Sequence, residues 1–322
     1  MHTKFTILVA GILLLLMPAL LPLTAQPDNV YRTETFRTGN APSLSAATSG
    51  GNVTIERHDR DEVVIHVIAR RAGRYLSPGD DLSQYADLTI EQNGDEISVS
   101  ARSRNRSGFS LFGSSGGNVS VSYHIMAPAG SSAEATTSGG NISLRGLNGT
   151  QNLRTSGGNV SLADASGSLR ASTSGGNIEA RGVSGELDAS TSGGRITLSN
   201  SSGNLRVRTS GGNISIRDSN GTISASTSGG NITASIAEPG ESVNLTTSGG
   251  NVSLNLPASL TATDSPGLTL NLRGSSASMQ GTLRGEMQNS DISRNRISGR
   301  FGAGASEITL RTSGGRTTLT FE

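Results

Sequence analysis

The sequence predicts an all-β fold: a single-chain β-solenoid with 18-residue coils, two short strands per coil, and irregular capping strands at both ends. Thr-Ser-Gly-Gly recurs along the chain, and apolar residues alternate with polar ones between its copies. A helical fold is disfavoured because the windows lack a 3.6-residue period and Gly supplies 43 of 322 residues. The repeat starts at Thr48, Thr137, Thr155, Thr173, Thr191, Thr209, Thr227, Thr247 and Thr312, and each step from Thr137 to Thr227 is 18 residues.

Each 18-residue period contains two short strands and two Gly-rich turns. In residues 177–194, Ile178 and Ala180 alternate with polar neighbours in one strand, and Leu187 and Ala189 do so in the next. Such a unit cannot bury its own apolar face, so we expect coils stacked at a rise of about 4.8 Å around a thin core. Two apolar columns repeat through the array: Ile142, Val160, Ile178, Ile196, Ile214 and Ile232, and Leu169, Leu187, Leu205 and Ile223. Gln151 replaces the Leu of the first coil, which predicts a partly solvated end.

The Ser-Gly-Gly-Asn turn has to reverse the inward and outward parity of the chain. Thr173 and Ile178 lie five residues apart and must both point inward. Gly accepts a positive φ and Asn tolerates it, so we expect these residues to adopt it in the turn. Stacked coils would also bring the Asn amides about 4.8 Å apart, the spacing of a side-chain amide ladder. We assign this column a structural rather than a ligand-binding role: Asn141, Asn159, Asn177, Asn213, Asn231 and Asn251, interrupted by Arg195 and Arg316.

The chain divides into four segments by composition and regularity. Residues 1–25 have the basic, apolar and small-residue order of a signal peptide, which places the mature N-terminus near Gln26; a retained membrane anchor is the alternative. Residues 26–136 hold longer, more charged strands, which we interpret as an irregular β region and cap of the same domain. Residues 137–264 form the regular 18-residue repeats. Residues 265–322 form irregular coils and closing strands.

Composition excludes several classes of function. The chain has no Cys and only four His, which argues against a disulfide framework, a thiol nucleophile and a metal centre. We therefore expect no cofactor and no metal. A formal net charge of +1 and 3% aromatic residues give no sign of a nucleic-acid partner. After signal cleavage we expect no integral membrane span, and the oligomeric state stays open.

Three motifs are candidates for catalytic or metal sites. Ser115 lies in a Gly-Ser-Ser-Gly-Gly pattern that resembles a nucleophile elbow, but no helix follows it. Glu186 and Asp188 point outward on one strand about 7 Å apart, within reach of acid–base work on a glycosidic bond. Asp164 and Asp218 are isolated, whereas calcium solenoids carry an Asp in every turn. The preferred interpretation is structural for all three.

Four stretches carry a family resemblance. They are the strand–loop–strand of residues 52–63, the strand and Pro turn of residues 121–130, the Ser-Gly-Gly-Asn array, and the closing strands of residues 302–315. Together they resemble the bacterial putative-adhesin family of β-strand-repeat domains, whose function is undefined. The resemblance covers nearly all of the mature chain. It implies an extracytoplasmic β-solenoid and brings no catalytic residues.

One outward column suggests a ligand. Arg145, Arg181 and Arg217 are spaced 36 residues apart, with Ala163 and Ser199 between them. They would therefore repeat on every second coil, about 9.6 Å apart. Guanidinium groups bind carboxylate and sulfate in a bidentate way, so an anionic glycan could lie across the column. Ordinary solubilising surface charge is the alternative.

These observations favour a non-enzymatic, exported, adhesin-like or cell-envelope interaction scaffold. Its expected partners are cell-surface or envelope polysaccharides or proteins. The periplasm, the cell surface and the medium all stay open as destinations. Two alternatives remain: a carbohydrate-active enzyme on a β-helix, such as a polysaccharide lyase or hydrolase, and a purely structural envelope spacer. An enzyme would need perturbed carboxylates in a cleft, whereas a scaffold presents flat ladders.

Overall fold

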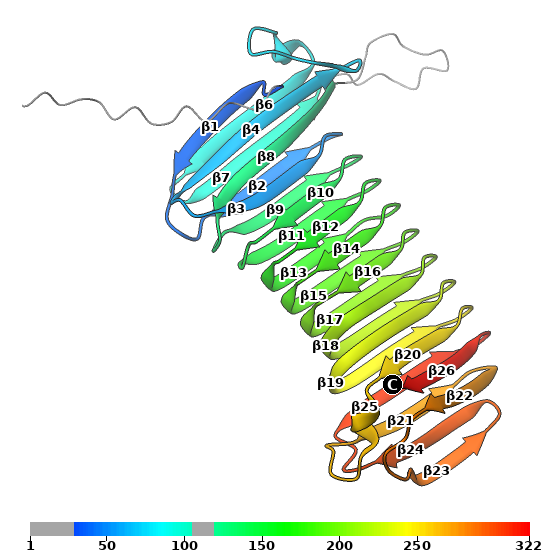
Figure 1. Cartoon of the computed structure of the whole chain (residues 1–322). Helices are drawn as coiled ribbons and strands as arrows, with labels where there is room; N and C mark the ends of the chain where they lie inside the picture. The colour runs from blue at the N-terminus through cyan, green and yellow to red at the C-terminus, as the bar shows by residue number, and fades with distance from the viewer. Residues whose placement is uncertain (1–28, 105–118) are drawn as a thin grey trace, which may run out of the picture.

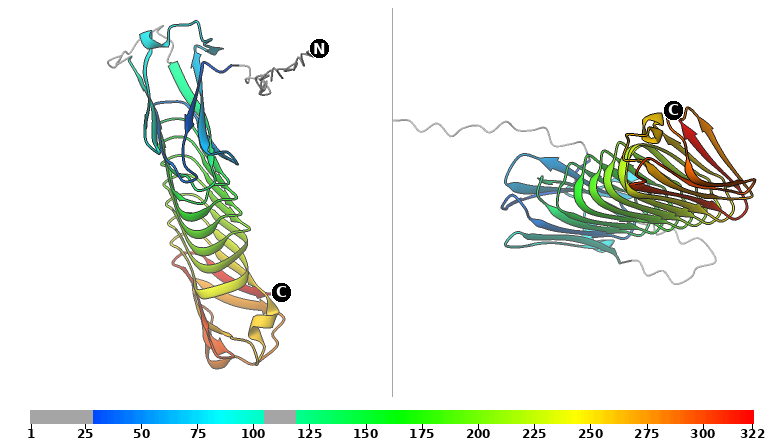
Figure 2. Two further views of the ribbon diagram at one scale, coloured as in Figure 1. Left: turned by 90° about the vertical axis from the view of Figure 1, so that its left-hand side faces the viewer. Right: turned by 90° about the horizontal axis from the view of Figure 1, so that it is seen from below.

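The protein forms an elongated β-solenoid, which confirms the predicted fold class (Figure 1). The computed structural model describes residues 29–104 and 119–322, and this part of the chain contains 26 strands, two short 3-10 helices and no α-helix. The coils stack along one axis into a flattened rod with two facing walls (Figure 2). No helix in these described residues is long and apolar enough to cross a membrane. The predicted signal peptide, residues 1–25, lies outside the described residues.

We name the two walls after their inward columns. The Ile wall consists, in spatial order, of β8 (Val119–Pro128), β3 (Val53–His58), β10 (Ile142–Arg145), β12 (Val160–Ala163), β14 (Ile178–Arg181), β16 (Ile196–Ser199), the first halves of β18 (Ile214–Thr227) and β19 (Ile232–Thr247), β20 (Val252–Leu256), β26 (Arg316–Phe321) and β22 (Ser276–Gly281). The Leu wall consists of β7 (Glu96–Ser103), β2 (Ser43–Thr48), β9 (Ser132–Thr137), β11 (Thr150–Thr155), β13 (Ser166–Ser172), β15 (Ser184–Thr191), β17 (Ser202–Thr209), the second halves of β18 and β19, β25 (Ser306–Thr312) and β21 (Leu268–Arg273).

The strands within each wall are parallel and in register with the repeat. Ile178 pairs with Ile196 across β14 and β16, and Leu187 pairs with Leu205 across β15 and β17. Each of these side chains is at most 1% exposed, so the two apolar columns face each other and form the core. Because every coil contributes the same layer, burial is continuous along the rod.

The Thr of each Thr-Ser-Gly-Gly points inward and joins successive coils. Thr173 is 6% exposed; its hydroxyl donates to the carbonyl oxygen of Gly158 in the preceding coil at 2.8 Å and accepts from the backbone N–H of Gly176 at 3.2 Å. The equivalent bonds recur from Thr137 to Thr312. This hydroxyl satisfies two backbone groups that the turn takes out of the strand ladder.

The turn glycines correct one expectation. Neither they nor the Asn column adopt a positive φ. The second glycine is required by close approach instead: a Cβ on Gly176 would lie 1.9 Å from the carbonyl oxygen of Gly158. Positive φ occurs at the opposite turn, where Asp164 (52°) and Asp218 (48°) are equivalent by the 18-residue repeat to Gly146, Gly182 and Asn200.

Gln151 is a second correction. It is 1% exposed rather than solvated, because β9 continues the Leu wall beyond it and places Ala133 beside it. Its Nε2 donates to the carbonyl oxygen of Ser131 at 2.8 Å, while its Oε1 has no partner among the described residues. The first regular coil is therefore inside the stack, not at its end.

Both ends of the rod are built from coils that are stacked out of sequence order. At one end, the coil of β2 and β3 lies between the coil of β7 and β8 and the coil of β9 and β10. Beyond it, β1 (Arg32–Arg37), β4 (Glu62–Arg71), β5 (Arg74–Tyr75) and β6 (Ala86–Asn93) add antiparallel pairs. The short helix Leu82–Gln84 lies before β6.

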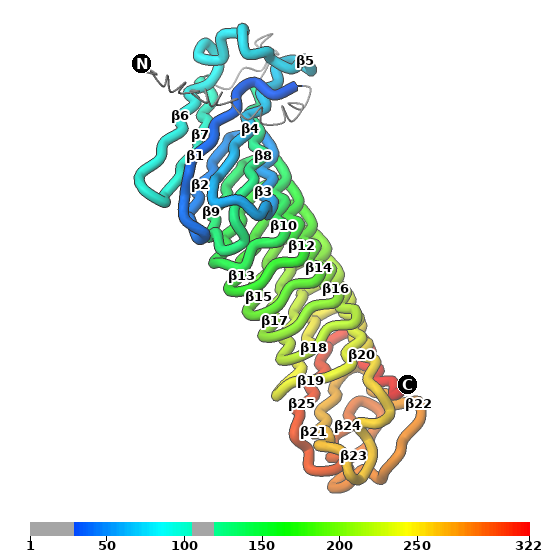
Figure 3. Tube along the Cα trace, turned by 60° about the vertical axis from the view of Figure 1, so that its left-hand side comes forward, coloured from blue at the N-terminus to red at the C-terminus, as the bar shows by residue number. Residues whose placement is uncertain are grey.

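The other end repeats this arrangement with a later segment. The coil of β25 and β26 lies between the coil of β19 and β20 and the coil of β21 and β22 (Figure 3). The outermost strands, β24 (Arg296–Phe301) and β23 (Gln288–Ser293), pair antiparallel, and the short helix Ala258–Thr261 follows β20. Phe301 and Phe321 pack edge to face with ring centroids 5.9 Å apart and fill the core there.

Candidate ligand-binding face

The structure places Arg145, Arg181 and Arg217 in one outward column of the Ile wall. Their register runs through Ala163 and Ser199, so a guanidinium group occurs on every second coil. All three side chains are exposed. The column is therefore repetitive and accessible to a ligand that lies along the rod axis.

The charges of this column are unequally compensated. Arg145 Nη2 lies 3.9 Å from Asp164 Oδ2, and Glu56 occupies the neighbouring register position on β3. Arg181 and Arg217 make no ion pair with any residue in the described ranges 29–104 and 119–322. These two arginines therefore keep their hydrogen-bonding capacity for solvent or a ligand.

The Asn column forms a ladder, but with different bonds from those expected. The side-chain Oδ1 of each Asn accepts from the backbone N–H of the next coil, rather than amide joining amide. Asn159 N donates to Asn141 Oδ1, and Asn177 N donates to Asn159 Oδ1, each at 2.8 Å. Asn52 starts the ladder. Since Oδ1 is occupied, the Nδ2 groups form a row of exposed donors along one edge of the Ile wall.

Arg195 interrupts this ladder. Its backbone N–H still donates to Asn177 Oδ1 at 2.8 Å, but its guanidinium has no acceptor to offer the N–H of Asn213. Arg in place of Asn at position 195 thus removes one hydrogen bond of the ladder, the bond to the backbone N–H of Asn213. Positions that break a local structural rule are where functional constraints are expected.

Arg195 and Arg217 flank a shallow groove of about 650 Å³. The groove is also lined by Thr197, Ser215 and Thr233, which lie in register on three successive coils. Neither arginine forms an ion pair within the described part of the chain. The groove combines hydroxyl groups with two arginines and one carboxylate, that of Asp218. The hydroxyl and guanidinium groups can donate hydrogen bonds to a polyol that carries negative charge, and Asp218 is the one acidic group in the lining.

The hydroxyl column between the Asn and Arg columns was missed by sequence reasoning. It was visible as the Ser or Thr that follows each inward Ile or Val. Glu179 replaces the hydroxyl on one coil. Its members are Thr54, Ser143, Ser161, Thr197, Ser215, Thr233 and Ser253.

The two candidate catalytic carboxylates, Glu186 and Asp188, lie on the opposite, Leu wall. Asp188 lies 3.5 Å from Arg208 Nη1 and in register between Arg170 and Arg206. The ion pair thus engages a carboxylate that acid–base catalysis would use as a free acid or base. Glu186 is exposed at the start of the same strand.

The other candidate site residues are Asp164, Asp218 and Ser115, and the structure describes the two aspartates. Asp164 and Asp218 occupy turn positions that need a positive φ, a conformation Asp tolerates. Among the described residues, no group of three or more His, Cys, Asp or Glu side chains could hold a metal ion. Ser115 lies outside the described residues.

Comparison with known proteins gives a family and several remote structural likenesses. The model of the family Toastrack DUF4097 matches residues 41–320. No protein of curated function matches the chain.

The structural likenesses cover most of the chain at low identity. A putative adhesin from Bacteroides fragilis is 12% identical over 90% of this chain and 96% of its own, with a TM-score of 0.38. A putative lipid binding protein from Parabacteroides distasonis is 14% identical over 89% of this chain and 96% of its own, with a TM-score of 0.44. A putative cell adhesion protein from Clostridium sporogenes is 8% identical over 90% and 99%, with a TM-score of 0.18.

Proposed function

The chain belongs to the Toastrack DUF4097 family, and from that premise we propose that it is an exported, non-enzymatic scaffold that binds acidic polysaccharide of the cell envelope along its Ile wall. The resemblance expected from the repeats is thereby confirmed at the level of the family. The family supplies the fold, and the proposed function comes from the surface chemistry of the wall.

One observation supports this function above the others. Three parallel columns run along the Ile wall: amide donors and hydroxyl groups that recur on successive coils except at Arg195 and Glu179, and a guanidinium on every second coil. A linear polymer of sugars presents repeated hydroxyl and carboxylate groups, so it can make the same contact many times. Individually weak contacts then add through multivalency.

The proposed export rests on the order of residues 1–25, and mass spectrometry of the exported protein is its test. A mature N-terminus near Gln26 supports export, whereas a membrane-bound chain that keeps Met1 contradicts cleavage and favours a tethered protein.

The binding function is tested with protein purified from cells that express the full chain. Its affinity for polygalacturonate is measured beside that for neutral dextran, and Arg145, Arg181 and Arg217 are together replaced by Gln. We expect the triple variant to bind polygalacturonate at least tenfold more weakly and the wild-type interaction to weaken with added salt. The fold should persist, because exposed positions tolerate such changes within about 0.5 kcal/mol.

A matched control separates a specific column from general surface charge. Arg102 lies in β7 and Arg104 directly follows it, at the end of the rod formed by β1 to β8, and Arg104 pairs with Asp87. Replacing both by Gln should leave binding unchanged. Equal affinity of the Ile-wall triple variant and the wild type would refute the proposed function and favour a structural spacer.

A further inference from the structure

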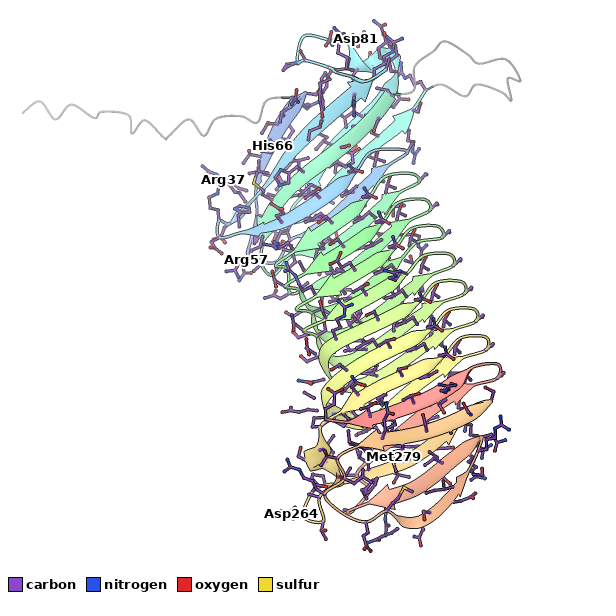
Figure 4. The ribbon with its side chains drawn as sticks, turned by 45° about the vertical axis from the view of Figure 1, so that its right-hand side comes forward. Arg37, Arg57, His66, Asp81, Asp264 and Met279 are labelled. Atoms are coloured by element: carbon purple, nitrogen blue, oxygen red, sulfur yellow. The ribbon has the colours of Figure 1, made fainter. Side chains whose placement is uncertain are left out.

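A second, separate pocket lies at the end of the Ile wall where β4, β5 and β8 meet. It has a volume of about 280 Å³ and includes Asn52, the first residue of the ladder, with Arg70, Tyr75, Ser122 and His124. Its lining contains a guanidinium, an imidazole, an amide and several hydroxyl groups, but no carboxylate. His66, labelled in Figure 4, lies on β4 beside His124 with ring centroids 6.0 Å apart.

Arg70 is held in place without an acidic partner. It lies directly across the β4–β5 hairpin from Tyr75, and its guanidinium carbon is 5.5 Å from the centre of that ring. Its Nε donates to the carbonyl oxygen of Gly73 at 3.1 Å. Within the described residues it forms no ion pair, so its two terminal nitrogens are oriented and available. A pre-organised guanidinium loses little freedom when it binds an anion.

The other polar groups of the pocket also have donors to spare. Asn52 Oδ1 already accepts from the backbone N–H of Asn141 at 2.9 Å, which leaves its Nδ2 as a donor. Ser122 Oγ accepts from the backbone N–H of Asn52 at 3.0 Å, which leaves its hydroxyl proton. His124 Nε2 lies 3.3 Å from Glu56 Oε2, on a residue that does not line the pocket. The pocket therefore offers hydrogen-bond donors, which favours a ligand rich in hydrogen-bond acceptors.

We propose that this pocket binds a single acidic sugar unit, a pyranose that carries one carboxylate. The carboxylate pairs with the terminal nitrogens of Arg70, the geometry guanidinium groups favour. Asn52 and Ser122 donate to ring or hydroxyl oxygens. Tyr75 is 43% exposed and supplies apolar surface for the C–H groups of the ring. The site does not depend on the proposed polymer function, because Arg145, Arg181 and Arg217 do not line it.

The test is isothermal titration of protein purified from cells expressing the full chain, with sodium glucuronate, glucose and inorganic phosphate as separate probes. We expect glucuronate to bind, and to bind at least tenfold more tightly than either glucose or phosphate. Equal affinity for glucose would overturn the role of the carboxylate. Equal affinity for phosphate would show a general anion site and overturn the assignment to a sugar. Absence of glucuronate binding at millimolar concentrations would overturn the proposal.

Three variants locate the site. Arg70→Gln should weaken glucuronate binding at least tenfold, and Tyr75→Leu about threefold. Arg74→Gln is the matched control: Arg74 is on the same hairpin and exposed, but pairs with Asp80 at 3.7 Å and does not line the pocket. It should bind as the wild type does. Thermal melting of each variant checks the fold, and an unchanged affinity in a folded Arg70→Gln variant would refute the site.

The design also separates this site from the proposed polymer face. The Arg145, Arg181 and Arg217 triple variant should keep full affinity for glucuronate, and Arg70→Gln should keep most of the affinity for polygalacturonate. Loss of glucuronate binding in the triple variant would place the sugar on the arginine column and contradict the pocket.

Discussion

Replacement of Gly176 by Ala should disrupt the stacking of two coils, whereas the same change at Gly175 should not. The added Cβ of residue 176 would lie 1.9 Å from the carbonyl oxygen of Gly158, although real Cβ atoms essentially never approach within 3.0 Å. At residue 175 the nearest atom would be 3.8 Å away. Neither glycine has a positive φ, so backbone strain does not distinguish them.

The expected cost follows from the movement that relief requires. The two turns must separate by about 1.1 Å, the difference between 3.0 and 1.9 Å. The bond from Thr173 Oγ1 to Gly158 O would then lengthen from 2.8 Å beyond hydrogen-bond range. An unpaired buried carbonyl costs about 1–3 kcal/mol and overpacking costs a similar amount, so we expect a loss of about 2–6 kcal/mol.

Calorimetry of the two variants is the assay. At this chain length the loss corresponds to a fall in Tm of about 3–12 °C for Gly176→Ala. Gly175→Ala should be neutral or raise stability by about 0.5 kcal/mol, because Ala restricts the unfolded chain. If both variants melt together, the close approach of the turns does not determine the glycine, and the reasoning is wrong.

Three further predictions concern the core, the ladder and pH. Ile196→Asp should lower the free energy of unfolding by more than about 3 kcal/mol, because it buries an unpaired charge. Ser190 points outward, so Ser190→Asp should change the stability little. Equal denaturant midpoints for the two variants would contradict the assignment of inward and outward side chains. Arg195→Asn restores the acceptor for the N–H of Asn213 and should raise stability by about 0.5–1 kcal/mol, which urea denaturation measures. Burial and the neighbouring His124 lower the pKa of His66 in the folded protein. Near pH 6.5 the unfolded chain therefore binds more protons than the folded protein, so stability should fall as the pH drops below that value. The Tm of His66→Gln, followed from pH 7.5 to 5, should depend less on pH than that of the wild type.

The structure of a coil could be predicted from the repeat, because which side chains point inward depends only on the alternation and spacing of residues within one period. Ile178 and Leu187 are buried and Thr173 points inward, as their alternation and spacing indicate. The reason for the turn glycines could not be obtained in this way, since it depends on the distance between Gly176 and a carbonyl oxygen one coil away. The burial of Gln151 was equally hidden, because the sequence does not show that β9 continues the wall.

The candidate sites follow the same division. The arginine column could be read from the 36-residue spacing, because stacked coils convert that spacing into adjacency. The pocket around Arg70 could not be predicted from the sequence. It is formed by Asn52, the β4–β5 hairpin and the part of β8 near Ser122, and the strand pairings that bring them together do not follow the 18-residue repeat. A non-repetitive site requires the tertiary register, which only the structure supplies.

The placement of β25 and β26 has a consequence for biosynthesis. Residues 306–321 are made after residues 268–281, yet they lie between those residues and the regular coils. A chain that has been made only as far as residue 305 therefore lacks the coil of β25 and β26, which is an inner layer of the stack. In that chain β21 and β22 have no neighbouring coil to pair with. Phe301 would then also lack its aromatic neighbour Phe321. This end of the rod can consequently form only once β26 has been made, whereas the preceding coils need no residue later than their own neighbours in order to stack.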